Sequence, residues 1–227
     1  SGTFFNVGTT TVTYSAQDNL GTTDACSFTV TVNDEEAPVL TCVSLDVFPN
    51  DPGMCSRVVN NNLAPNISEN CNVASITYEL TGATTGTGIN DATGTTFFIG
   101  VTILTYTVTD DAGNSSTCEV LIAVNDTDIP TGLQCPPTVI VSPDLGMTTA
   151  VVNNIALINA GLDNCGIDSI AYTLSNATTG TGINDASGET FNLGSTTVTY
   201  EVFDAFGNSI SCFFNVIVTD VYGVVVS

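Results

Sequence analysis

The chain has 227 residues and a formal net charge of −22, with Arg57 as its only basic side chain and no histidine or lysine. A surface with this charge repels nucleic acid and anionic membranes and attracts divalent cations. The missing residue types exclude an imidazole base, a histidine-based zinc or copper site and lysine Schiff-base chemistry. Because these catalytic groups are missing, we expect that the chain is not an enzyme. Since 43% of the residues are hydrophobic and 11% are charged, we also expect packed cores and not a disordered chain.

Residues 1–37 are expected to form a β-hairpin. Val12 and Tyr14 alternate with polar neighbours, and Cys26 and Phe28 do the same after a turn at Gly21. A lone hairpin is only marginally stable in water, so this one needs further strands. They are expected either upstream of the first residue, which we favour, or from another chain.

Residues 38–128 read as a longer series of short strands and turns. We expect strands at 39–42, 57–59 and 75–80, a turn at 50–53, a polar loop at 60–71 and a Gly/Thr loop at 83–92. A closing hairpin follows, and its inward-facing residues are expected to be Leu104, Tyr106, Val108, Cys118, Val120, Ile122 and Val124.

Residues 129–220 repeat this plan. The turn now falls at 143–146 and the third strand at 170–174. The loop 177–186 is identical to 83–92, which supports a tandem duplication. Residues 221–227 lack the second acid and the proline of the earlier junctions, and are expected to be a tail or the start of another segment.

The repeat itself predicts the fold class. Tyr14, Tyr106 and Tyr200 recur about every 93 residues, and Cys26, Cys118 and Cys212 keep the same spacing. A period of this length, with short alternating strands and many turn signals, is typical of a β-sandwich. We therefore predict an all-β chain of tandem Ig-like β-sandwich domains, one partial and two complete. The three tyrosines are expected to face the cores.

Four motifs carry a resemblance to a known family. Gly-Thr-Thr-Thr-Val-Thr-Tyr at 8–14, Cys-Ser-Phe-Thr-Val-Thr-Val at 26–32, Asp-Asp-Ala-Gly-Asn at 110–114 and Cys135-Pro136 resemble the HYR (hyalin repeat) domain. The resemblance implies an extracellular Ig-like module found in tandem in adhesion and surface proteins, in the style of large secreted adhesins of Bacteroidota. It divides the chain into the end of a first repeat (1–37), two repeats (38–128 and 129–220) and the remainder (221–227).

Eight cysteines without a Cys-x-x-Cys motif indicate disulfides in an oxidising, extracytoplasmic setting. The first and last strands of a sandwich are neighbours, so we expect bonds Cys42–Cys118 and Cys135–Cys212, with Cys26 bonded to a residue before the first. Cys55 and Cys71 remain as a further pair, although they fall at opposite ends of a strand and Thr148 replaces the first of them in the next repeat. Cys165 is then free or bonded to another chain.

The acidic junctions are candidate Ca²⁺ sites. Antiparallel topology directs each junction toward the loops of the next repeat, so we expect two clusters of carboxylates, the hard oxygen ligands that Ca²⁺ prefers. The first comprises Asp34, Glu36, Glu69, Asp110 and Asp111, and the second comprises Asp126, Asp128, Asp163 and Asp204. The alternative is that these acids only form turns and carry solvated charge.

These features favour a structural segment of a surface adhesin or filament. Alternatives are a carbohydrate-binding module, an appendage of a secreted enzyme, and a fibre subunit that accepts a strand from a neighbour. Partners are expected to be neighbouring repeats, with other copies or a cell-surface glycan as further possibilities. Direct membrane insertion is not expected, because no apolar run is long enough to span a bilayer.

Overall fold

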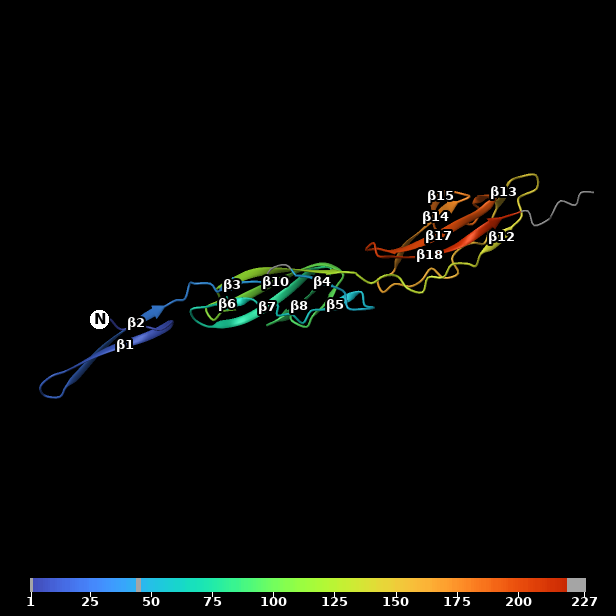
Figure 1. Ribbon diagram of the computed structural model, residues 1–227. Coiled ribbons are helices and arrows are strands. Elements are labelled where there is room, and N and C mark those ends of the chain that lie inside the picture. Colours follow the sequence, from blue (N-terminus) through green and yellow to red (C-terminus); the bar gives the residue numbers. More distant parts are fainter. Residues whose placement is uncertain (1, 44–45, 220–227) are drawn as a thin grey trace, which may run out of the picture. The chain divides into compact units, whose positions relative to one another are not determined.

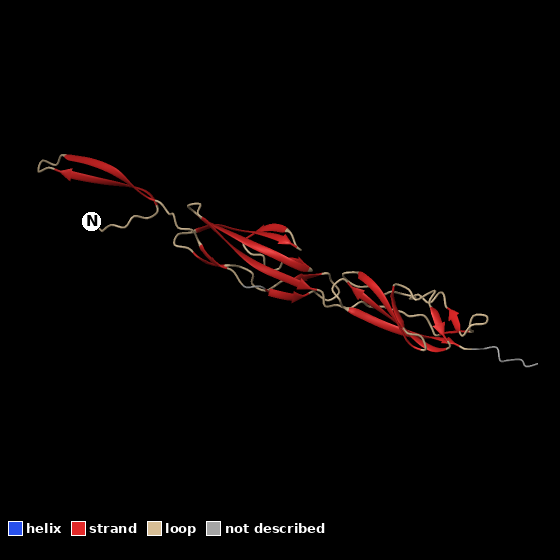
Figure 2. Ribbon diagram, turned by 90° about the horizontal axis from the view of Figure 1, so that it is seen from above, coloured by secondary structure: helices blue, strands red, loops and turns tan. Residues whose placement is uncertain are grey.

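The structure is a computed structural model that describes residues 2–43 and 46–219. Figure 2 shows that every regular element in these ranges is a strand, which confirms the all-β prediction. The expected end of the third repeat at Asp220 and the remainder 221–227 lie outside the described residues. The chain divides into two compact units, one comprising residues 1–46, 59–95 and 102–122 and the other 47–58, 96–101 and 123–227.

The first two strands, β1 (Gly8–Gln17) and β2 (Thr23–Val32), form the expected antiparallel hairpin, with Gly8 opposite Val32 and Gln17 opposite Thr23. Figure 1 shows this two-stranded ladder. Tyr14 stacks on Phe28 with ring centroids 6.1 Å apart, but its side chain remains 64% exposed. The expectation that Tyr14 faces a core is therefore wrong, because this sheet has only two strands and no opposite layer.

The second repeat contains a five-stranded sheet with the order β4-β11-β10-β7-β8. Its strands are β4 (Asp46–Pro49), β7 (Val73–Gly82), β8 (Gly86–Ile89), β10 (Gly100–Asp110) and β11 (Ser115–Asn125). Two short sheets accompany it: β3 (Val39–Thr41) pairs with β6 (Asn66–Ser68), and β5 (Ser56–Val58) pairs with β9 (Thr96–Phe98).

The third repeat has the same strand order, β12-β18-β17-β14-β15, beside the pair β13-β16. These strands are β12 (Val139–Val141), β13 (Thr149–Val151), β14 (Ile167–Asn176), β15 (Gly180–Ile183), β16 (Thr190–Asn192), β17 (Gly194–Asp204) and β18 (Ser209–Val218). Strand β12 pairs in parallel with β18 and forms one edge of the sheet. Figure 1 shows β14, β17 and β18 side by side.

Each predicted Gly/Thr loop contains a short strand, β8 in one and β15 in the other, that its sequence did not indicate. In β15, Gly182 lies opposite Tyr172, and a side chain at Gly182 would overlap the tyrosine ring. Gly88 and Tyr78 have the same relationship in β8. These glycines let an aromatic ring lie directly over the edge strand, so the segment pairs as a strand despite its loop-like composition.

The cores follow the predicted alternation of the closing hairpins. Tyr106 and Tyr200 are fully buried, as predicted. The Tyr200 hydroxyl accepts a hydrogen bond from the Ala186 amide (2.9 Å) and lies 3.0 Å from the carbonyl of Ile155, to which it donates. The core of the third repeat comprises Ala150, Val152, Ile155, Tyr172, Leu174, Ala186, Phe191, Val198, Tyr200, Phe214, Val216 and Val218.

Three disulfides are present in the described part of the chain. Cys42 bonds Cys118 and Cys135 bonds Cys212, as expected, each with a Cα–Cα distance of 5.9 Å. The predicted Cys55–Cys71 bond is wrong, and so are both alternatives for Cys165: Cys55 bonds Cys165, 110 residues away, and Cys71 is free and exposed. The reason is that Cys55 lies in a turn of the second repeat that contacts the loop before β14.

Candidate metal centres

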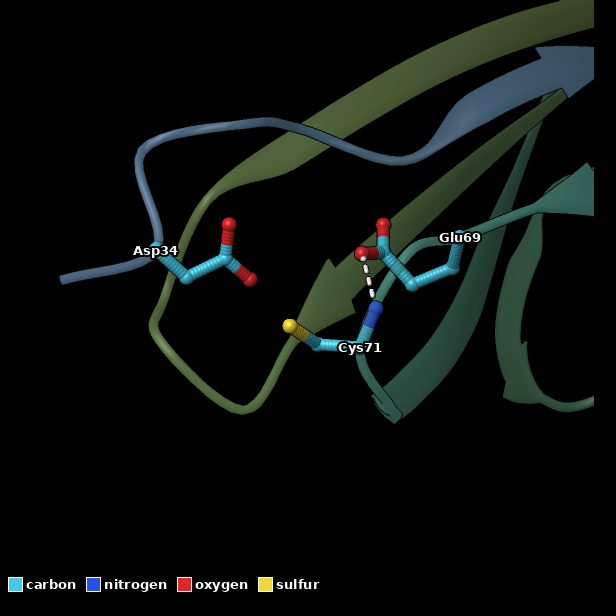
Figure 3. Close-up of side chains that lie close together, drawn as sticks. All are labelled: Asp34, Glu69 and Cys71. Carbon is cyan, nitrogen blue, oxygen red and sulfur yellow. Dashed lines mark hydrogen bonds between the residues drawn. The ribbon is translucent and has the colours of Figure 1, made fainter. Parts of the chain in front are cut away.

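The first candidate centre joins the linker after β2 to the loop between β6 and β7. Ligand atoms of Asp34, Glu69 and Cys71 all lie within 4.8 Å of one another. Figure 3 shows the two carboxylates and the sulfur converging, with the Cys71 amide donating a 3.0 Å hydrogen bond to Oε1 of Glu69. The same oxygen accepts the Asn70 amide at 2.8 Å, so the loop backbone fixes the Glu69 side chain.

The second candidate centre repeats this arrangement in the third repeat. Asp126, after β11, lies with Asp163 and Cys165 under the same 4.8 Å limit. The Cys165 amide donates to Oδ1 of Asp163 at 2.8 Å, as the Cys71 amide does to Glu69. Because Cys165 is in a disulfide, its sulfur is not a thiolate ligand, and the oxygen atoms are the donors that both centres share.

Three carboxylate oxygens at these centres have no hydrogen-bond partner. They are Oδ2 of Asp34, Asp126 and Asp163, all buried from solvent at the atom level. Asp126 as a whole is only 6% exposed. A buried anionic oxygen without a donor is costly, and a cation would satisfy it. Oxygens bound to one Ca²⁺ at about 2.4 Å lie within about 4.8 Å of each other, so the spacing fits this ion.

Asp110 and Asp204 organise the neighbouring hairpin turns. Oδ2 of Asp204 accepts the side-chain amide of Asn208 at 2.7 Å, and its Oδ1 accepts the backbone amides of Phe206 and Asn208. Burial by itself would raise the pKa of Asp204, but these hydrogen bonds outweigh burial and hold its pKa below the ordinary value. Asp110 has its pKa lowered in the same way, chiefly by Asn114.

Each linker is also bound through its backbone. Asn114 Nδ2 donates to the carbonyls of Asp34 and Glu36 at 3.2 Å, and Asn208 Nδ2 donates to the carbonyl of Asp126 at 3.3 Å. These asparagines were not among the residues predicted for the sites. Their recurrence four residues after Asp110 and Asp204 was the available signal, since this spacing suits a side chain that bridges a turn.

The electrostatics differ between the acids. Burial raises the pKa of Asp126, and the negative charges of Asp163 and Asp204 add to this effect. At the first centre, the adjacent Asp34 carboxylate, burial and the other surrounding carboxylates raise the pKa of the Cys71 thiol to about 11. Each centre therefore concentrates negative charge that favours a bound proton or cation.

Three other predicted ligands lie outside the two close clusters. Asp128 Oδ2 accepts the Gly53 amide at 2.7 Å and the Asn50 side chain at 3.0 Å, so it binds the turn of the second repeat. Glu36 Oε2 accepts the Asn70 side chain at 2.7 Å. Asp111 lines the hollow beside Asp34 and Cys71, but it is not a member of the close cluster.

The second and third repeats are β-sandwich modules of an extracellular protein, and each contains an internal disulfide. The chain belongs to the HYR domain family, which it matches over residues 1–32, 52–124 and 125–218. No helix among the described residues has the length and apolar character needed to cross a membrane.

Two curated relatives are hyalins from sea urchins. The chain is 30% identical to Hyalin of Strongylocentrotus purpuratus over 91% of its own length and 16% of that protein. It is also 30% identical to Hyalin of Lytechinus variegatus, over 97% of its length and 38% of that protein. The chain thus spans well under half of either relative, and neither supports the expected Bacteroidota context.

Solved structures that resemble this chain do so with low sequence identity and low TM-scores. The fibronectin(III)-like modules of Clostridium thermocellum CbhA are 14% identical with a TM-score of 0.32, covering 80% of this chain and 94% of that one. Protocadherin Gamma B7 extracellular cadherin domains 1–4 are 15% identical with a TM-score of 0.37, covering 93% and 57%.

Proposed function

We propose that this chain is a non-catalytic structural segment of an extracellular adhesion array or filament, in which Ca²⁺ ties each acidic linker to the repeat that follows it. The observation that carries the proposal is the recurrence of the same oxygen cluster at both linkers, with Oδ2 of Asp34, Asp126 and Asp163 buried and unpartnered. Acids whose only role is to form turns or carry solvated charge would not be expected to bury carboxylate oxygens without hydrogen-bond partners.

The bound ion would link backbone and side chain at each centre. Asp126 and Asp163 would supply carboxylate oxygens to the ion in the third repeat, while Asn208 holds the linker carbonyl of Asp126. At the first centre, Asp34 and Glu69 would do the same. The ion would offset the repulsion between these carboxylates and restrict the motion of the linker. Extracellular sites of this kind bind Ca²⁺ at roughly 10⁻⁴–10⁻³ M.

The test is calorimetric titration of the oxidised chain with Ca²⁺. We expect two sites, one lost in Asp34→Asn and the other in Asp126→Asn. Matched controls are Glu119→Gln and Asp168→Asn, which neutralise exposed acids on β11 and β14 that belong to neither close cluster. If all four variants bind Ca²⁺ equally, the acids only form turns and carry solvated charge, and the proposal is wrong.

A second candidate function is assembly by strand or sheet addition on the β1–β2 hairpin. It is favoured by the exposed apolar face of this hairpin, where Tyr14 is 64% and Phe28 49% exposed. The corresponding Tyr106 and Tyr200 are buried. Sedimentation equilibrium tests it, since assembly predicts a mass that rises with concentration and falls again in Tyr14→Ser. A strict monomer at all concentrations would exclude this role.

A further inference from the structure

Cys71 lies in surroundings that repeat those of the disulfide-bonded Cys165. Each cysteine follows an acid and an asparagine, and each donates its amide to the carboxylate of that acid, at 3.0 Å for Cys71 and 2.8 Å for Cys165. Each also has a linker aspartate beside it, Asp34 or Asp126. The two loops thus present a sulfur, an amide side chain and a linker carboxylate in the same arrangement.

At Cys165 this arrangement holds the turn Gly53–Cys55 of the second repeat. Cys55 forms the disulfide, and the Asn164 side chain donates to the Met54 carbonyl at 3.1 Å. The linker acid Asp128 accepts the Gly53 amide at 2.7 Å. A covalent bond and two hydrogen bonds therefore recognise three consecutive residues of one turn.

At Cys71 the same contacts are available but the turn is absent. Cys71 is a free, exposed thiol beside a hollow that Asp34, Asn70 and Asn72 help to line. Asn70 donates to Oε2 of Glu36 at 2.7 Å in place of a turn carbonyl. Glu36 occupies the linker position of Asp128, the residue that accepts the Gly53 amide in the other centre. Asn70 and Glu36 therefore satisfy each other where a turn would bind both.

We propose that Cys71, Asn70 and Glu36 form an acceptor site for the Gly-x-Cys turn of another HYR repeat, closed by a disulfide to the cysteine of that turn. The Cys55–Cys165 linkage is one step of this covalent ladder, and Cys71 is the attachment point of another. The site requires no metal ion, so it stands apart from the calcium proposal.

The bond forms by thiol–disulfide exchange with an oxidised disulfide such as glutathione disulfide. The thiolate of the turn cysteine attacks glutathione disulfide, forms a mixed disulfide and releases one glutathione thiolate. The Cys71 thiolate then attacks the turn sulfur of that mixed disulfide, and a second glutathione leaves. The two protons from the protein thiols end on the two glutathione thiols, and the disulfide is reduced as the protein is oxidised.

The full chain can present both halves of this bond. In Cys165→Ser the turn cysteine Cys55 loses its partner while Cys71 stays free, so one copy offers a folded turn and another copy offers the acceptor. The variant is equilibrated in glutathione redox buffer with a chelator present and then analysed by non-reducing gel and peptide mapping. Cys26, the other free exposed thiol, is an internal competitor.

We expect disulfide-linked oligomers whose junction is Cys55–Cys71. This junction should exceed Cys55–Cys26 about tenfold, the factor that two ordinary hydrogen bonds supply. Adding Asn70→Ala should bring the two junctions near parity, and Cys71→Ser with Cys165→Ser should leave only the minor Cys55–Cys26 junction. Circular dichroism and thermal melting of Cys165→Ser check that its turn is folded. The unaltered chain, in which Cys55 is already bonded to Cys165, should form little of the Cys55–Cys71 junction in the same buffer.

Parity between Cys71 and Cys26 in the folded Cys165→Ser chain would overturn the proposal, and so would a Cys55–Cys71 bond found within single chains. If Cys165→Ser does not fold, the companion variant Cys55→Ser decides. Its free Cys165 is mixed with a disulfide-activated peptide of residues 46–58, and Cys165 and Cys71 should both capture it in preference to Cys26. Capture by Cys165 alone would then exclude the Cys71 site.

Discussion

The hydroxyl group of Tyr200 connects three segments around the core of the third repeat. It is fully buried, accepts the Ala186 amide and donates to the Ile155 carbonyl, so it joins β17 to two loops. Burial raises the pKa of Tyr200 to about 12. The alternating pattern around Tyr200 predicted its burial, but not the backbone groups it would bind, because these lie in loops whose paths the sequence does not specify.

Tyr200→Phe should therefore destabilise the chain by about 1–3 kcal/mol, since two buried backbone groups lose their partner. The raised pKa also gives a pH dependence. Because the folded state favours the protonated tyrosine, this stabilisation is complete below about pH 10 and is lost as the pH rises toward 12. Guanidinium unfolding at neutral and alkaline pH measures both effects. An unchanged free energy of unfolding and an unchanged alkaline slope in the variant would contradict the assigned hydrogen bonds.

At the element scale, the glycine-rich strands β8 and β15 were the hardest part of the fold to predict. Alternation identified the long strands β7, β10, β14 and β17, whose side chains face a core on one side. It failed for β15 because Gly180 and Gly182 carry no side chain, and a Gly/Thr segment reads as a loop. The missing information was the position of Tyr172 across the ladder.

Gly182→Ala should destabilise the third repeat by about 1–3 kcal/mol, the usual cost of overpacking, because the new methyl group overlaps the Tyr172 ring. The matched control is Gly180→Ala in the same strand, whose new methyl group meets only ordinary contact with Leu174 at 3.8 Å. Thermal unfolding of the two variants gives the comparison. Equal melting temperatures would mean that the tyrosine moves aside and that Gly182 is not required.

At the scale of the whole molecule, the cysteine pairing shows what repetition can and cannot predict. Cys42–Cys118 and Cys135–Cys212 follow from the position of the first and last strands in every repeat. Cys55–Cys165 joins different repeats, so a repeat treated in isolation cannot give it. The available signal was that Cys165 has no partner left in its own repeat, where Thr148 stands in place of the turn cysteine.

Replacing this bond should be costly. Cys55→Ser with Cys165→Ser should lower the free energy of unfolding by about 2–4 kcal/mol, because the unfolded chain regains the entropy of an open loop. Cys26→Ser, which removes a free thiol, is the control and should have no comparable effect. Calorimetry of the oxidised proteins measures the difference. A double variant as stable as the control would show that the bond does not constrain the chain.

The proximity of the linker acids to the loops of the next repeat was predicted in outline from antiparallel topology. Asp34 with Glu69, and Asp126 with Asp163, are brought together as that argument required. The sequence could not show that Asp128 and Glu36 turn to other partners, since this depends on the Gly53 turn and on Asn70. The proposed role of the linkers depends on Ca²⁺ binding at these centres.

The most direct measurement is the melting temperature of the unaltered chain and of Asp126→Asn, each in a chelator and in millimolar Ca²⁺. Burial and neighbouring charge raise the pKa of Asp126, so at neutral pH its ionised form is unfavourable in the folded state without a cation. Asp126→Asn should therefore melt at or above the temperature of the unaltered chain in the chelator, and below it in Ca²⁺. If Ca²⁺ raises both proteins equally, or neither, the second linker is not a calcium centre.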